Sequence, residues 1–179
     1  LSVPERFSFP LDIFDKWEGL ALLWTDGASE KKFSFSELKL LSSKGAGALK
    51  KLGISKGDKV LVMLPNIPEW WEVMLSLMRL NAIPIPATTL LTAKDVGYRL
   101  SATDIKAVIA TADDRSKIED AAANISRELI LIGIGEIKGW QSYIKEREMS
   151  DPFEGERAFS DDPALIYFTS GTTGLPKMV

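Results

Sequence analysis

The chain has 179 residues, of which 45% are hydrophobic and 26% are charged, as expected for one soluble globular domain or one lobe of a larger one. Its 22 basic and 25 acidic residues give a net charge of −3. With no basic surplus, nucleic acid is not an expected partner. The sequence holds no cysteine and no histidine, which excludes disulfides, thiol nucleophiles, Ser-His-Asp triads and zinc sites built on those residues from this segment.

The first third of the chain predicts a short helix, a hairpin and a long helix. The short helix is expected within residues 7–17, with Asp12 as its cap. Strand-like runs at 20–24 and 32–35 flank an Asp-Gly turn, which predicts a hairpin. Ser36 is then predicted as the N-cap of a helix over residues 38–52, which Gly53 ends.

Apolar runs of strand length then alternate with helical patterns. Strands are predicted at residues 59–64, 83–86, 107–110, 129–132 and 164–168. Helices are predicted at 69–80, 92–100 and 118–125, and the polar stretch 133–163 is expected to form a helical turn and an approach loop. Continuous apolar strands separated by helices are typical of the α/β class, with a largely parallel sheet and helices on both faces.

The residues after the last predicted strand carry the chemistry. Nine consecutive residues hold four hydroxyls, two glycines, one proline and one lysine, and no acid: Thr169, Ser170, Gly171, Thr172, Thr173, Gly174, Leu175, Pro176 and Lys177. Glycines let successive backbone amides converge on one anion, hydroxyls add donors, and the lysine adds a full positive charge. The pattern differs from Gly-x-x-x-x-Gly-Lys-Ser/Thr, the ordinary P-loop. It predicts a polyphosphate site; the alternative is a Ser/Thr/Gly-rich surface hairpin.

The stretch Tyr167-Phe-Thr-Ser-Gly-Thr-Thr-Gly-Leu-Pro-Lys177 resembles the signature of the adenylate-forming, AMP-binding superfamily, which includes acyl-CoA synthetases, luciferases and peptide-synthetase adenylation domains. Pro65-Asn-Ile-Pro-Glu-Trp-Trp71, together with Met78-Arg-Leu80 and Tyr98-Arg-Leu100, resembles the medium-chain acyl-CoA synthetases. The similarity runs from about Trp24 to the end. It implies that residues 1–179 are an incomplete N-terminal domain of an acyl-CoA synthetase-like fold, ending just after the phosphate-binding loop.

The resemblance also implies two half-reactions. A medium-length or branched carboxylic acid reacts with ATP to give acyl-AMP, and coenzyme A then displaces AMP to give acyl-CoA. Residues 169–177 would bind the ATP phosphates, and Thr172 would bind Mg²⁺. The catalytic lysine and most of the acyl pocket are expected beyond Val179, so this segment by itself is expected to be inactive.

Two other functions stay open at this point. One is an adenylation module that loads a carrier protein, and the other is a nucleotide-binding or structural domain without chemistry. No apolar run approaches the roughly 18 residues of a membrane-spanning helix. The missing cysteines and the lack of a signal segment favour an intracellular compartment, the cytoplasm or, in a eukaryote, the mitochondrial matrix. Assembly into a homo-oligomer also stays open.

Several other residues are given structural roles. Trp70 and Trp71 are predicted to pack in the core, with an acyl tunnel as the alternative. Asp161 and Asp162 are expected in a turn or cap, with a metal site as the alternative. Four further charged residues are predicted to be exposed: Glu69, Glu72, Arg79 and Arg99. For the two arginines, a contact to the CoA phosphates is the alternative.

Overall fold

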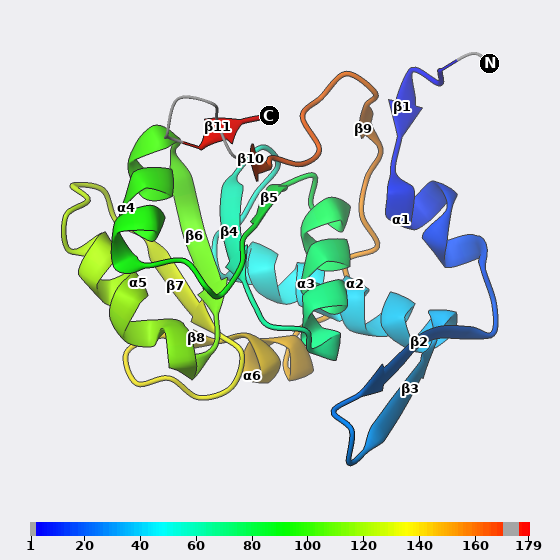
Figure 1. Ribbon diagram of the computed structural model, residues 1–179. Helices are drawn as coiled ribbons and strands as arrows, with labels where there is room; N and C mark the ends of the chain where they lie inside the picture. The colour runs from blue at the N-terminus through cyan, green and yellow to red at the C-terminus, as the bar shows by residue number, and fades with distance from the viewer. Residues whose placement is uncertain (1–2, 170–175) are drawn as a thin grey trace.

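The computed structural model describes residues 3–169 and 176–179, and it has the predicted α/β architecture (Figure 1). The α-helices are α1 (Phe9–Asp12), α2 (Phe35–Lys51), α3 (Pro68–Arg79), α4 (Ala93–Ala102), α5 (Arg115–Ala122) and α6 (Tyr143–Glu148). The strands are β1 (Arg6–Phe7), β2 (Leu20–Thr25), β3 (Glu30–Ser34), β4 (Lys59–Met63), β5 (Ile83–Pro86), β6 (Ile105–Ala110), β7 (Ile130–Gly133), β8 (Gln141–Ser142), β9 (Ala158–Phe159), β10 (Phe168–Thr169) and β11 (Lys177–Met178). Short 3-10 turns are η1 (Phe14–Lys16) and η2 (Ala112–Asp114). No helix among these residues is long and apolar enough to cross a membrane.

The main sheet has five strands in the order β5-β4-β6-β7-β8, and all of its pairings are parallel. The predicted parallel sheet is therefore confirmed. Strand β8 is not predicted from the sequence, because it is only two residues long and both of them are polar. A separate hairpin of β2 and β3 confirms the turn predicted around Asp26, whose carboxylate accepts hydrogen bonds from the amides of Ala28 and Ser29.

Both faces of the sheet are covered, as the apolar strands require. Successive side chains of β4 alternate between two hydrophobic clusters: Val60 and Val62 join one, and Leu61 and Met63 join the other. The first cluster includes residues of α2, α3 and α6, and the second includes residues of α4 and α5. Figure 1 shows α4 and α5 together on one side of the sheet. Each fully buried aliphatic side chain stabilises the fold by about 1.5–3 kcal/mol.

The start of α2 differs from the prediction. Ser34 rather than Ser36 is the N-cap: its Oγ accepts a hydrogen bond from the Glu37 amide at 3.2 Å, and the Glu37 carboxylate accepts one from the Ser34 amide at 2.7 Å. This is a capping box, which requires Ser and Glu three residues apart. At the start of α1, Ser8 is the N-cap, and Asp12 assists by accepting a hydrogen bond from the Ser8 amide.

The strand predicted at 164–168 is wrong over Ala164–Tyr167. This segment lies beside β5, and the Ile166 amide donates to the Pro84 carbonyl at 3.1 Å. The Ile83 and Ala87 amides donate to the β4 side, so residues 84 and 86 present their backbone to the outer edge, where both are prolines without an N–H. The edge therefore offers acceptors but no donors, and a regular ladder cannot form.

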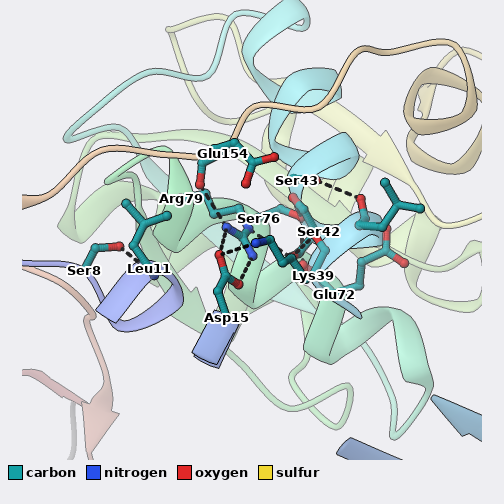
Figure 2. Close-up of polar contacts among 11 residues, drawn as sticks. Ser8, Leu11, Asp15, Lys39, Ser42, Ser43, Glu72, Ser76, Arg79 and Glu154 are labelled. Atoms are coloured by element: carbon teal, nitrogen blue, oxygen red, sulfur yellow. Dashed lines mark hydrogen bonds and ion pairs between the residues drawn. The ribbon is translucent and has the colours of Figure 1, made fainter. Parts of the chain in front are cut away.

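The predicted exposure of Glu72 and Arg79 is also wrong. Figure 2 shows the contacts of Arg79 with Asp15 and Ser42. Arg79 is 0% exposed, and it forms two hydrogen bonds of 3.0 and 2.6 Å with the Asp15 carboxylate and a third of 3.0 Å with Ser42. Glu72 is 3% exposed and accepts hydrogen bonds from the Tyr143 hydroxyl at 2.8 Å and from Arg147 at 2.7 Å. Unpaired buried charges would cost several kcal/mol each, so these partners are what allow the burial.

Candidate nucleotide-binding site

The residues on either side of the glycine-rich stretch form an antiparallel hairpin. In its register Phe168 lies opposite Met178, and Thr169 lies opposite Lys177. Tyr167 and Val179 extend the pairing through two reciprocal backbone hydrogen bonds of 2.9 Å. Because directly opposed residues point to the same face, the exposed side chains of Thr169 and Lys177 share one face of this hairpin. The paired residues lie on either side of the predicted loop, and the choice between a polyphosphate site and a Ser/Thr/Gly-rich surface hairpin stays open.

Three of the nine predicted site residues are brought together by this pairing: Thr169, Pro176 and Lys177. The Thr169 hydroxyl donates to the Lys177 carbonyl at 3.5 Å. The other six lie outside the described residues: Ser170, Gly171, Thr172, Thr173, Gly174 and Leu175. The proposed magnesium ligand Thr172 is among these. Within residues 3–169 and 176–179, no group of three or more acidic side chains is gathered in a way that could hold a metal.

Helix α4 contacts Phe168 of β10 and Pro176, the residue before β11. The Tyr98 hydroxyl donates a hydrogen bond of 2.9 Å to the Pro176 carbonyl. The Tyr98 ring meets the Phe168 ring edge-on, with centroids 6.3 Å apart, and the Arg99 guanidinium carbon lies 5.0 Å from the centroid of Phe168. Arg99 is only 8% exposed, so its predicted exposure is wrong. The sequence pattern missed both contacts because Tyr98 and Pro176 are 78 residues apart.

The electrostatics of this region favour an anion. The nine-residue stretch has no acidic side chain, and Lys177 stands exposed at its end. Arg99 adds a second cation at the base of the hairpin; burial lowers the pKa of this guanidinium, and the neighbouring charge of Asp95 opposes that effect. An arginine stays charged at neutral pH. The described part of the site therefore offers one exposed cation, Lys177, and one exposed hydroxyl, Thr169, whereas Arg99 is buried beneath the hairpin.

A cavity of about 620 Å³ lies elsewhere in the structure, and it is mainly apolar. Its lining includes Phe7 and Phe9 of the N-terminal arm, Met78 of α3 and Phe159 of β9. None of Thr169, Pro176 and Lys177 lines it, so the cavity and the hairpin are separate features.

The two tryptophans of α3 do not line that cavity either. Trp70 packs against the first hydrophobic cluster, which confirms its predicted core role. Trp71 is 48% exposed, so the same prediction is wrong for it. The two rings form an edge-to-face pair with centroids 4.8 Å apart. Asp162 does lie in a turn, where its carboxylate accepts a hydrogen bond from the Phe159 amide and pairs with Lys56.

Comparison with known proteins places this geometry in a family context. The model of the AMP-binding enzyme family matches residues 18–179, which include the hairpin. The chain is 39% identical over 193 residues to acyl-coenzyme A synthetase ACSM5, mitochondrial, of Homo sapiens, and 36% identical over 192 residues to acyl-coenzyme A synthetase ACSM4, mitochondrial, of Rattus norvegicus. These alignments cover 99% and 98% of this chain but 33% of each relative. The chain thus spans about a third of the length of the curated relatives that it matches.

Solved structures share the fold. An acyl-CoA synthetase of Brucella canis aligns with a TM-score of 0.86 and 23% identity, over 97% of this chain and 33% of that one. A long-chain-fatty-acid-CoA ligase of Archaeoglobus fulgidus aligns with a TM-score of 0.87 and 21% identity, over 100% of this chain and 37% of that one. The family match covers most of the sequence and extends through the hairpin, and so the chain belongs to the AMP-binding enzyme family.

Proposed function

We propose that the full-length protein is an ATP-dependent acid–CoA ligase for a medium-length or branched carboxylic acid, and that residues 1–179 are the front part of its AMP-binding domain. The observation that carries this proposal is the hairpin that sets Thr169 opposite Lys177 at the two ends of an acid-free, glycine-rich loop. The names of the relatives, which are acyl-coenzyme A synthetases, support the choice of reaction.

In the first half-reaction, a carboxylate oxygen attacks the α-phosphorus of ATP and pyrophosphate leaves with the bonding electrons. Negative charge grows on the β- and γ-phosphates as this bond breaks, and donors fixed around those phosphates stabilise the transition state. Residues 169–177 are assigned that role: the hydroxyls and amides donate hydrogen bonds, and Lys177 supplies charge. In the second half-reaction, the thiol of coenzyme A attacks the acyl carbon, and AMP and a proton are released.

The loop composition also suits Mg²⁺, which prefers hard oxygen ligands and is usually held by one or two protein groups together with substrate phosphates. Thr172 is the proposed protein ligand. The ion, when bound, would neutralise charge on the phosphate oxygens. The Thr169 hydroxyl and the Lys177 carbonyl, which lie 3.5 Å apart, bring two further oxygen atoms of this hard type to the end of the loop.

The test is carboxylate-dependent exchange of pyrophosphate into ATP, measured on the full-length protein with acids of graded chain length. We expect exchange to be highest with medium-length or branched acids. Lys177→Ala should lower it by roughly 10²- to 10³-fold, the usual effect of removing one preorganised donor. Lys32→Ala is the control, because Lys32 lies on the separate β2–β3 hairpin and is exposed; its exchange rate should match the wild type.

An unchanged exchange rate in Lys177→Ala would remove the loop from the mechanism. ATP binding without exchange for any acid would favour a domain without chemistry. Transfer of the acyl group to a carrier protein in preference to coenzyme A would favour the adenylation module. For the compartment we propose the mitochondrial matrix or the cytoplasm, guided by the relatives, whose names describe them as mitochondrial; fractionation of cells that express the protein distinguishes the two.

A further inference from the structure

Two consecutive residues of α4, Tyr98 and Arg99, contact the base of the hairpin. Tyr98 bonds to the Pro176 carbonyl, next to Lys177, and it also packs edge-on against Phe168. Arg99 lies over the ring of the same phenylalanine. The same helical turn therefore contacts Phe168 of β10 and Pro176, which adjoins β11, on the two sides of the predicted phosphate-binding loop.

Helix α4 is a firm support for these contacts. Its first turn is closed by a capping box between Thr92 and Asp95, and Val96 and Leu100 are fully buried in the second hydrophobic cluster. The Arg99 guanidinium is held from below by a 2.9 Å hydrogen bond to the Asp95 carbonyl. The backbone that carries Tyr98 and Arg99 is thus fixed relative to the sheet.

The hairpin itself is a weak structure. Among the described residues its ladder is short, with two residue pairs and the adjoining Tyr167–Val179 pair, and a two-stranded hairpin of this size is marginally stable in water without further packing. Contacts outside the ladder must therefore set where the loop ends lie. The hydrogen bond to Pro176 fixes the peptide plane that leads into Lys177, and the cation–π and edge-to-face contacts fix Phe168 just before Thr169.

We propose that Tyr98 and Arg99 are positioning residues for adenylation, which hold the two ends of the phosphate-binding loop in register with each other. This inference rests on the proposed function of that loop. Misplacement of a donor by about 1 Å can cost as much as 10²-fold in rate. Loss of the single neutral hydrogen bond from Tyr98 to the Pro176 carbonyl is expected to have a smaller effect on the rate, about tenfold.

The experiment compares the two half-reactions of the full-length protein in the Tyr98→Phe variant, which lacks only the phenolic hydroxyl. Pyrophosphate exchange depends on the β- and γ-phosphates, whereas thioester formation from supplied acyl-AMP and coenzyme A does not involve them. We expect exchange to fall about tenfold while thioester formation stays within about twofold of the wild type. Arg99→Lys keeps the charge but loses the planar group over Phe168, and it should give the same selective loss.

Tyr143→Phe is the matched control. It removes a phenolic hydroxyl from a buried residue on the other face of the sheet, where that group donates to Glu72. This variant should lose stability and leave the ratio of the two half-reactions unchanged. Equal loss of both half-reactions in Tyr98→Phe and Arg99→Lys, or no loss of exchange in either, would overturn the proposed positioning role of these two residues. A wild-type protein without exchange would instead sink the proposed function, so the two failures are distinguishable.

Discussion

Single residues carry most of the structure that the sequence pattern did not reveal. Glu72, Arg79 and Arg99 sit in helices among apolar neighbours, and a charged residue in such a pattern is usually assigned to solvent. Their burial depends on partners that are distant in the sequence: Tyr143 is 71 residues from Glu72, and Asp15 is 64 residues from Arg79. Periodicity reports which residues share a face of one helix, but not which polar group from another element will meet them.

The buried carboxyl of Glu72 makes stability depend on pH. Burial raises its pKa, although the charge of Arg147 and the hydrogen bonds from Tyr143 and Arg147 act in the opposite direction. With a raised pKa, the folded chain keeps this proton at a pH where the unfolded chain has lost it. The contribution of Glu72 to the free energy of unfolding is therefore fully present below about pH 4.5, the ordinary pKa of a glutamate side chain. It is lost as the pH rises through the raised pKa of the folded state.

Glu72→Gln tests this linkage, because the amide does not titrate. Urea denaturation from pH 4 to pH 8 should show the wild type losing stability relative to the variant as the pH rises. The measured quantity is the difference in the free energy of unfolding between the two proteins. The capping carboxylates Glu37 and Asp95 have lowered pKa values, so their contribution to stability changes with pH in the opposite direction and cancels in this difference. Parallel stability profiles would mean that Glu72 does not titrate differently in the folded chain.

Packing around Gly45 gives a second prediction at this scale. Gly45 is buried in α2, and a Cβ there would clash with the Tyr143 hydroxyl and with Ser76 Oγ. Gly45→Ala should therefore lower the free energy of unfolding by about 1–3 kcal/mol, as for other overpacked sites. Gly97→Ala in α4 is the control: its Cβ would be 3.9 Å from the Ala121 Cβ, and helix propensity predicts a gain of up to about 1 kcal/mol. Equal effects in urea denaturation would contradict this packing.

At the scale of elements, local patterns located the helices and most strands, while their ends needed more information. The capping box of α2 is visible in the sequence as Ser34 followed by Glu37, but Ser36, which is next to the acid, is an equally plausible cap from the local pattern alone. The failed strand before Tyr167 has a different origin. Its own residues are as apolar as those of a buried strand. Its neighbour β5, however, presents prolines without an N–H at the shared edge, and the sequence pattern does not reveal that these two segments lie side by side.

The capping box can be tested with a matched pair of serines. Ser34→Ala removes the hydroxyl that accepts the Glu37 amide and should lower the free energy of unfolding by about 1 kcal/mol. Ser36→Ala removes a hydroxyl from the first turn of α2, where it is hydrogen-bonded to Ser34 Oγ at 3.0 Å. This change should alter the free energy of unfolding by no more than about 0.5 kcal/mol. Thermal or urea denaturation measures both, and a larger effect at Ser36 would identify Ser36 as the N-cap.

At the scale of the whole molecule, the sequence was sufficient for the fold class and for the family. Continuous apolar strands separated by helices are a local signal of a covered parallel sheet, and the five-stranded sheet agrees with it. The site was predicted from one stretch of nine residues, of which the structure describes Thr169, Pro176 and Lys177. What the sequence did not predict is the support of that stretch by α4, because it arises only when the chain folds back over 78 residues.

The central claim is that residues 169–177 bind the triphosphate of ATP. The most direct measurement is a crystal structure of the full-length protein with a non-hydrolysable ATP analogue. We expect the β- and γ-phosphate oxygens within hydrogen-bonding distance of the loop amides and hydroxyls, with the Lys177 ammonium beside them and the Tyr98 hydroxyl still donating to the Pro176 carbonyl. A triphosphate bound away from this hairpin would contradict the claim.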